Sequence, residues 1–313
     1  MVQTILIGLG AGLAAALLFL APLGGSFLAM PLFILTGLPL AIAGLGWGPI
    51  AGVVAAVAGA VIIFAIVPTS LTALVFVLVF AVPVVWLTRL IGFSREGATG
   101  GREWYPTGRI LLHATLVVSL CLVAVGFLIG YQRAAMVKDA TDALLAWLAA
   151  AGPDATVPTA AEIAPVMGLY VALLPLLVGL MVVAITVFDL WLAALVARAS
   201  GRILRPAERL WTVLLPNEIL IGVAVAGVLA FLPGAFGEIA SVFAGAFACG
   251  LVLVGLAVLH AVTVGTGGRA AILTLAYVLI LFSGLPIVLF ALLGAGETFL
   301  HLRARRIGRP TKT

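Results

Sequence analysis

Long apolar blocks alternate with short polar stretches along the whole chain. Nearly uncharged runs cover residues 4–21, 27–43, 49–67, 70–88, 110–130, 165–188, 212–232, 238–260 and 270–296. These runs match the roughly 20 residues of helix that cross a bilayer core about 30 Å thick, where lipid offers no partner to an unpaired backbone group. We therefore predict an all-α, polytopic transmembrane helix bundle that forms a single integral membrane domain over residues 1–313.

Composition strengthens this prediction. The chain is 65% hydrophobic and 9% charged, whereas roughly 25% of residues are charged in soluble domains. No basic segment precedes the first apolar block, and "APLGGSF" follows it in place of a small-residue cleavage site. We interpret this block as a retained span rather than a signal peptide.

Basic residues mark two loops as cytoplasmic. Arginines are concentrated in residues 92–109 and 198–210, and the positive-inside rule places such loops in the cytoplasm. Between them, residues 131–164 carry four acidic residues against Arg133 and Lys138, as expected of an external loop. Counting spans back from the first basic loop places the N-terminus in the cytoplasm.

The last apolar block decides where the C-terminus lies. As one span it would leave the basic tail, residues 303–313, outside. The "SGLP" at 283–286 offers a break, since proline removes a backbone donor and biases the preceding residue away from helix. Splitting there gives segments over about 269–283 and 286–302 and returns the tail to the cytoplasm. We prefer ten segments with both termini inside; nine segments are the alternative.

The external stretch has order of its own. Over residues 132–152, Met136, Ala140, Leu144 and Trp147 recur at helical spacing, with charges on the other face. This pattern is typical of an amphipathic helix at the outer interface. An extension of the preceding span and a lid over an outward-facing cavity are the alternatives. Residues 153–164 have the composition of a loop.

Familiar catalytic motifs are absent. The sequence contains no GxxxxGK[ST], HExxH or CxxC. Cys121 and Cys249 lie in apolar spans, where a free thiol acts as a small hydrophobe. The histidines, His113, His260 and His301, fall near span ends without acidic partners at ligand spacing. We expect no enzymatic activity, no cofactor, no metal site and no nucleic-acid partner.

Ionisable residues within apolar segments are the strongest functional candidates, because a buried charge needs a partner or a watery cavity. Asp189 in "VVAITVFDLWLAALVARAS", and Glu218 with Asn217 in "LWTVLLPNEILIGV", are candidates for the lining of a substrate cavity. Alternatively, Asp189 lies at the cytoplasmic headgroup level beside a loop arginine, and Glu218 starts a helix, where its charge suits the dipole. Glu297 is expected to pair with Arg303 or a neighbour.

Residues 44–60, "GLGWGPIAGVVAAVAGA", are rich in glycine and alanine. Small residues let membrane helices approach closely. The candidate packing residues recur at four-residue spacing in two adjacent rows: Gly44, Gly48, Gly52, Ala55, Ala56 and Gly59. One row suffices for one partner helix, so the second row contacts either another helix of the bundle or a separate membrane subunit.

Three stretches carry a resemblance to known families: "GLPLAIAGLGWGPIAGVVAAVAGAVI", "DLWLAALVARASGRILRPAE" and "GLPIVLFALLGAGETFLHLRAR". Together they resemble the YybS-like family of uncharacterised bacterial inner-membrane proteins, which implies a multi-pass protein of the bacterial cytoplasmic membrane. The first stretch is also similar to the S components of energy-coupling-factor vitamin transporters. That similarity implies a bundle that captures a small molecule from outside and docks on a membrane coupling subunit, without an ATPase of its own.

Two classes of function follow. Pro31 and Pro39 interrupt the second apolar block, and broken membrane helices often mark binding sites in transporters. This interruption and the Asp189 and Glu218 positions favour a small-molecule binding or transport protein embedded in the lipid bilayer. The absence of a charge-rich transport pathway favours the alternative, a non-transporting scaffold or assembly protein of the envelope.

Overall fold

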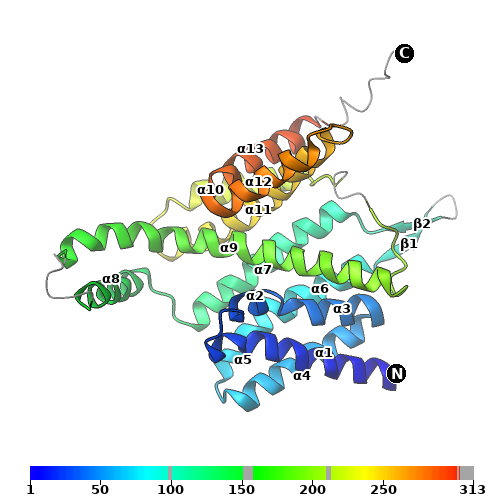
Figure 1. Cartoon of the computed structure of the whole chain (residues 1–313), viewed down its shortest axis with the longest axis horizontal. Helices are drawn as coiled ribbons and strands as arrows, with labels where there is room; N and C mark the ends of the chain where they lie inside the picture. The colour runs from blue at the N-terminus through cyan, green and yellow to red at the C-terminus, as the bar shows by residue number, and fades with distance from the viewer. Residues whose placement is uncertain (98–100, 151–157, 209–212, 302, 304–313) are drawn as a thin grey trace.

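A computed structural model describes residues 1–97, 101–150, 158–208, 213–301 and 303 of the chain. Its regular structure is almost entirely helical (Figure 1). The helices are α1 (Val2–Leu20), α2 (Ala29–Ile34), α3 (Gly37–Trp47), α4 (Pro49–Ile66), α5 (Ser70–Phe76), α6 (Val82–Ile91), α7 (Thr107–Leu128), α8 (Arg133–Ala149), α9 (Ala160–Ala199), α10 (Glu218–Leu229), α11 (Ala235–Val262), α12 (Arg269–Ser283) and α13 (Leu285–Leu300). A 3-10 turn, η1 (Ala21–Gly24), follows α1, and a π-helical turn, η2 (Val77–Ala81), joins α5 to α6.

The predicted helix bundle is confirmed, and the chain is a multi-pass membrane protein. Within the described ranges, seven helical segments are long and apolar enough to cross a membrane, with α2–α3 and α5–η2–α6 each counted as one. Three shorter apolar helices, α10, α12 and α13, bring the number to the preferred ten. The break expected at "SGLP" is present, because Gly284 adopts a left-handed conformation with φ of 66° between α12 and α13.

Helices α1 to α6 form one half of the bundle and α10 to α13 the other, with α7 and α9 between them (Figure 1). The buried side chains follow this division. The first core cluster combines α1, α3, α4 and α6 with parts of α7 and α9, whereas α10 and α11 dominate the second cluster. Val187 of α9 packs against all three core clusters. Helix α9 therefore joins the two halves.

Both arginine-rich loops lie at one end of the bundle, called the basic end below. Arg205, from the loop after α9, donates hydrogen bonds to the carbonyl of Ile91 and the hydroxyl of Thr107, which flank the other loop. That loop contains a small hairpin of β1 (Ser94–Glu96) and β2 (Arg102–Trp104). The C-terminal region lies at the same end, because Arg303 donates a hydrogen bond to the carbonyl of Val213, shortly after the second loop, over 2.7 Å.

The N-terminus lies at the same end. Arg202 stacks over the ring of Trp47, 4.8 Å from its centroid, and this contact places the start of α4 at the basic end. Helix α1 runs parallel to α4, since Gly8 faces Ala51 and Gly12 faces Ala55. The first residues of α1 therefore share the basic end with the last residues of α13.

The stretch 44–60 belongs to two helices rather than one. Gly48, with φ of 90°, separates α3 from α4, so Gly44 lies on one helix and Gly52 on the next. The two helices meet at these glycines: a Cβ at Gly52 would lie 3.4 Å from the Cα of Gly44. In the first row, Ala55 and Gly59 face α1. Ala56, in the second row, packs against the first core cluster. Both rows therefore contact helices of this chain, and a separate subunit on the second row stays a prediction.

Glycines outside that stretch permit the closest helix contacts in the C-terminal half. A Cβ at Gly255 of α11 would overlap the carbonyl of Phe290 in α13, and a Cβ at Gly294 of α13 would overlap the carbonyl of Leu251. Gly245 of α11 meets the carbonyl of Leu176 in α9 in the same way. Lipid tails are as apolar as the helices, so the hydrophobic effect does not drive helices together in a membrane. Small residues at the crossings let the backbones come close enough for van der Waals packing to do so.

The stretch predicted to be external differs partly from expectation. Helix α8 lies within the predicted 132–152 and packs against α9, and its Lys138 and Asp142 form an ion pair of 2.7 Å one turn apart. Of the predicted loop 153–164, residues 153–157 lie outside the described residues, and residues 160–164 are already helical. The reason is a capping box in which Thr159 and Glu162 satisfy free amides at the start of α9. Of the tail 303–313, only Arg303 is described.

Candidate functional site

Asp189 lies well inside the long helix α9, away from its C-terminal end. The sequence suggested that this span ends at residue 188, but the helix continues to Ala199. Ten further residues at about 1.5 Å each put Asp189 about 15 Å from that end. This is about half of a hydrocarbon core about 30 Å thick. Arg198, in the last turn of α9, is the first charged residue after Asp189.

The Asp189 side chain is buried against the start of α3. It is 1% exposed, and neither carboxylate oxygen has a hydrogen-bond partner among the described residues. The backbone amide of Gly37 lies against the carboxylate, outside full hydrogen-bonding geometry. A Cβ at Gly37 would lie 2.7 Å from Oδ2 of Asp189 and 3.2 Å from a methyl group of Val84. Any residue larger than glycine at position 37 would therefore collide with this carboxylate.

Hydroxyl groups on the surrounding elements do not donate to Asp189. Thr36, directly before α3, donates to the carbonyl of Phe33 over 2.6 Å. Thr88 on α6 and Thr186 on α9 donate to carbonyls of their own helices over 3.0 and 2.8 Å. Each hydroxyl proton is therefore committed to the backbone, while its oxygen lone pairs can still accept a hydrogen bond.

Two irregular helices border Asp189. The second span is interrupted between α2 and α3, where Leu35 and Thr36 form tight turns with hydrogen bonds to residues three positions back. The π-helical turn η2 precedes the segment of α6 that contributes Val84. Single π-turns and broken membrane helices concentrate at functional sites, because they free backbone groups and re-aim side chains. The interruption also directs the positive end of α3 at the carboxylate.

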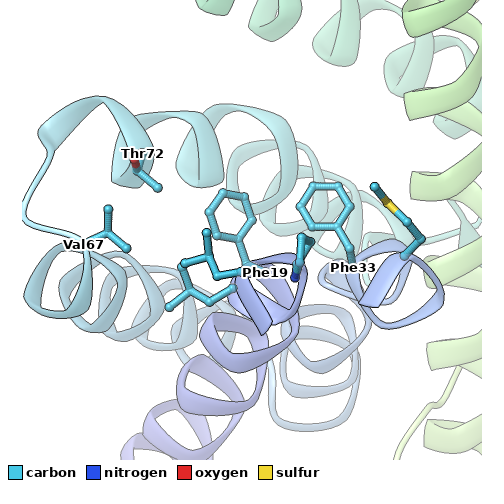
Figure 2. Close-up of a pocket in the computed structure, with 8 residues that line it drawn as sticks. Phe19, Phe33, Val67 and Thr72 are labelled. Carbon is cyan, nitrogen blue, oxygen red and sulfur yellow. The ribbon is translucent and has the colours of Figure 1, made fainter. Parts of the chain in front are cut away.

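An apolar pocket of about 390 Å³ opens at the end opposite the basic end. Phe19 of α1 and Phe33 of α2 lie beside it, with Val67 and Thr72 across from them (Figure 2). The two rings, 5.6 Å apart between centroids, also pack against Phe80. The segment that contributes Phe33 to this pocket reaches the Asp189 site four residues later, at Gly37.

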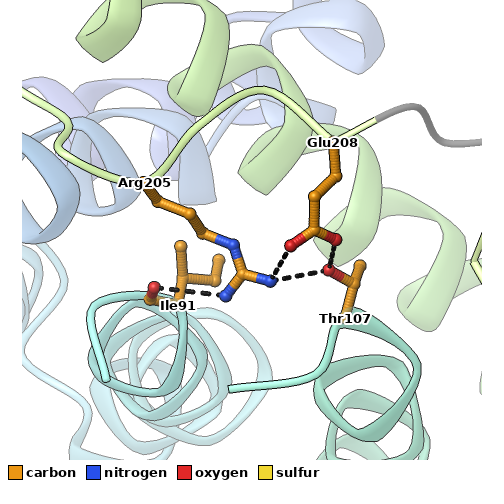
Figure 3. Close-up of polar contacts among 4 residues, drawn as sticks. All are labelled: Ile91, Thr107, Arg205 and Glu208. Carbon is orange, nitrogen blue, oxygen red and sulfur yellow. Dashed lines mark hydrogen bonds and ion pairs between the residues drawn. The ribbon is translucent and has the colours of Figure 1, made fainter. Parts of the chain in front are cut away.

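A cluster of hydrogen bonds around the buried Arg205 connects the loops at the basic end (Figure 3). The Arg205 guanidinium, 6% exposed, donates to Glu208 over 2.6 Å, to Thr107 over 2.7 Å and to the carbonyl of Ile91 over 3.4 Å. Thr107 in turn donates to Glu208. One side chain therefore joins the loop after α9 to the end of α6 and the start of α7.

The other predicted cavity residues are not brought to Asp189. Asn217 is the residue before α10, and Glu218 occupies its first turn; both are exposed. The adjacent Ile219 packs into the second core cluster, whereas Leu190, next to Asp189, packs into the first. Glu218 occupies the helix-start position considered in the sequence analysis.

Glu297 pairs with Arg303 as expected. Its carboxylate is fully buried, accepts from Nε of Arg303 over 2.9 Å and from the Arg303 backbone amide over 3.1 Å. His113 and His260 form hydrogen bonds with Tyr105 and Tyr277. In the described part of the chain, no group of three or more His, Cys, Asp or Glu side chains is placed to hold a metal ion.

Sequence patterns did not identify Gly37 or Arg205 as parts of polar sites. The "TG" at 36–37 inside an apolar span is the signal that marks the first, and the concentration of arginine in 198–210 marks the second without selecting one residue. In comparisons with known proteins, no protein-family model, curated protein or solved structure matches the chain.

Proposed function

We propose that the chain is a carrier-type membrane protein without an ATPase of its own, in which Asp189 binds a proton or the cationic group of a small molecule. One observation carries this proposal: a carboxylate that is 1% exposed, within an apolar helix long enough to cross a membrane, has no hydrogen-bond partner among the described residues. An ionisable group in hydrocarbon is costly, and such groups mark substrate and proton pathways.

A purely structural role would favour a paired carboxylate. Burial of an unpartnered charge opposes folding, so structural acids in membranes pair with cations or accept several hydrogen bonds. At Asp189, the positive end of α3 and the amide of Gly37 supply only partial charge. No charged side chain of the described residues acts on this carboxylate. A proton or a cationic ligand completes the site.

The rest of the N-terminal half supports a route from one side. With the basic end in the cytoplasm, as the positive-inside rule favours, the pocket beside Phe19 and Phe33 opens outward. Hydrogen bonds from the buried Arg205 to Thr107 and Glu208 then hold the two loops together at the cytoplasmic end. This arrangement agrees with the resemblance to S components, which implies capture of a small molecule from outside in a bacterial cytoplasmic membrane.

Carbodiimide labelling tests the site directly. A hydrophobic carbodiimide reacts with protonated carboxyl groups that are held within a membrane. We expect an adduct on Asp189 in the full chain, mapped by peptide mass spectrometry, and no adduct at that position in Asp189→Asn. Glu297, which is buried but ion-paired, is the internal control and is expected to stay unlabelled. Labelling of Glu297 with Asp189 unmodified would overturn the proposal.

Native mass spectrometry of the detergent-extracted protein separates carrier from scaffold. We expect a co-purified small molecule on the wild type that Asp189→Asn lacks or binds about tenfold more weakly, as lost charge-assisted hydrogen bonds predict. Equal occupancy in Asp189→Asn, together with unchanged folding, would favour a scaffold that holds its ligand elsewhere.

A further inference from the structure

A second cavity lies at the end opposite the basic end, between the middle helices and the C-terminal half of the bundle. It has a volume of about 310 Å³, opens to the surface and is lined by parts of α7, α8, α9 and α11. Its wall is largely aliphatic, with Leu122 and Phe127 from α7, Met136 from α8, Pro175 from α9 and Val242 from α11. This volume is at the lower end of small-molecule sites, which occupy roughly 300–1,000 Å³.

Two polar side chains enter this apolar wall. The hydroxyl of Tyr131, between α7 and α8, is buried and has no hydrogen-bond partner among the described residues. Glu238, in the first turn of α11, also lines this cavity. Burial raises the pKa of the Tyr131 phenol, Glu238 raises it further, and Arg133 opposes this rise. The phenol therefore keeps its proton at neutral pH.

The polar groups select a class of ligand. Glu238 offers a negative charge and only acceptors, and the Tyr131 oxygen can also accept a hydrogen bond. Arg133 already donates to the carbonyl of Gly168 over 3.3 Å. An anionic head group would meet the Glu238 charge, whereas an ammonium group has three donors for these acceptors. The aliphatic wall accommodates an alkyl chain or another apolar body.

We propose that this cavity binds an amphiphile with a primary ammonium head, held between the Glu238 carboxylate and the Tyr131 hydroxyl, and with its apolar tail against α7, α9 and α11. Helix α8 covers one side of the bound molecule through Met136. The ligand is either a membrane lipid with an ethanolamine head or a hydrophobic amine from outside.

This site is separate from the one proposed at Asp189. Pro175, in the cavity wall, and Asp189 lie 14 residues apart on α9, about 21 Å along the helix. The cavity is tested with variants at Tyr131 and Glu238, whereas the Asp189 site is tested by carbodiimide labelling. Failure of one proposal is therefore distinguishable from failure of the other.

Octylamine tests the ligand class, with octanol as the matched neutral probe. The full chain is placed in phosphatidylcholine nanodiscs, and thermal unfolding is followed as each probe is added. We expect octylamine to raise the melting temperature and octanol to have a much smaller effect. Glu238→Gln is expected to weaken apparent octylamine affinity about tenfold or more, and Tyr131→Phe to weaken it less, because a bond to a charged group contributes more.

A filled cavity provides a test that removes no polar group. Gly126 lines the cavity, and a Cβ there would meet nothing within 4 Å. We expect Gly126→Leu to fold and to abolish the octylamine response. Gly227→Leu is the matched control, because Gly227 lies on α10, outside the cavity lining, with equally open space for a Cβ. Asp142→Asn controls for loss of an acidic charge on α8.

The outcomes divide clearly. Equal responses to octylamine and octanol, an unchanged octylamine response in Glu238→Gln, or equal responses in Gly126→Leu and Gly227→Leu would each overturn the proposal. If phosphatidylethanolamine in the nanodisc removes the octylamine response of the wild type, the ligand is supplied by the membrane. If the response persists in that lipid, the ligand is a hydrophobic amine from outside.

Discussion

Two carboxylates are buried in different regions of the bundle, one where α9 meets the N-terminal half and one in the C-terminal half, and their surroundings differ. In the C-terminal half, the carboxylate of Glu297 accepts two hydrogen bonds from Arg303, which in turn donates to the carbonyl of Val213. On α9, where this helix packs against the N-terminal half, Asp189 is equally hidden but has only the amide of Gly37 against it. The first arrangement closes a helix end, whereas the second leaves a charge that a proton or ligand can neutralise.

The helices around these carboxylates differ as well. Helices α11 and α13 are uninterrupted beside Glu297, and they meet at Gly255 and Gly294, whose hydrogens face opposite backbones. Around Asp189, the second span is interrupted before α3, and a π-helical turn precedes α6. Regular helices satisfy all their backbone groups, while interrupted helices leave some free. Burial alone therefore does not separate a structural acid from a candidate functional one, whereas the presence or absence of a partner distinguishes Glu297 from Asp189.

Glu297→Gln gives the largest expected change in stability. The substitution leaves the buried Arg303 guanidinium without its ion-pair partner, and breaking a buried pair in this way costs about 3–5 kcal/mol. We expect a marked fall in the melting temperature of the detergent-solubilised chain. Glu297→Met combined with Arg303→Met, which removes both charges, is expected to recover part of this loss. A melting temperature unchanged in Glu297→Gln would break the contrast between the halves.

Gly37→Ala gives an intermediate effect. The added methyl would lie 2.7 Å from Oδ2 of Asp189, so the carboxylate or α3 must move. Overpacking of this kind costs about 1–3 kcal/mol, and we expect it to lower carbodiimide labelling of Asp189. Gly10→Ala is the control, since a Cβ at Gly10 of α1 would meet nothing within 4 Å. Unchanged labelling in Gly37→Ala would place the reactive carboxylate in a different geometry.

Asp189→Asn gives the smallest expected change in stability. Asparagine has nearly the same shape and removes an uncompensated charge, so we expect the free energy of unfolding to change by less than about 0.5 kcal/mol or to increase. Thermal unfolding, in parallel with Glu297→Gln, measures this directly. A loss as large as that of Glu297→Gln would mean that Asp189 is a structural residue, and the proposed carrier function would fail with it.

Much of the architecture could be read from the hydrophobic pattern. The ten apolar helices, the break at "SGLP" and the pairing of Glu297 with Arg303 are all present in the described structure. These features depend on interactions between residues close in sequence or on the transfer of apolar helices into lipid. Such terms are visible without knowledge of which helices are neighbours.

The candidate site was predicted only in part. Asp189 was selected because it interrupts an apolar run, but its depth was uncertain because the apolar pattern does not show where α9 ends. Its isolation from Glu218, and its contact with Gly37, depend on the packing of α9 against α3. The same applies to the Arg205 cluster, which joins residues about 100 positions apart in the chain.

By itself, the sequence determined that this chain is a multi-pass bundle of apolar helices with its arginines gathered in two loops and a tail. Transfer into lipid is a property of each segment, so composition and length suffice. Only the tertiary structure decided which buried acid has a partner, which glycines lie at helix crossings, and where cavities remain. These properties depend on neighbours from distant segments, and no local pattern records which helices will meet.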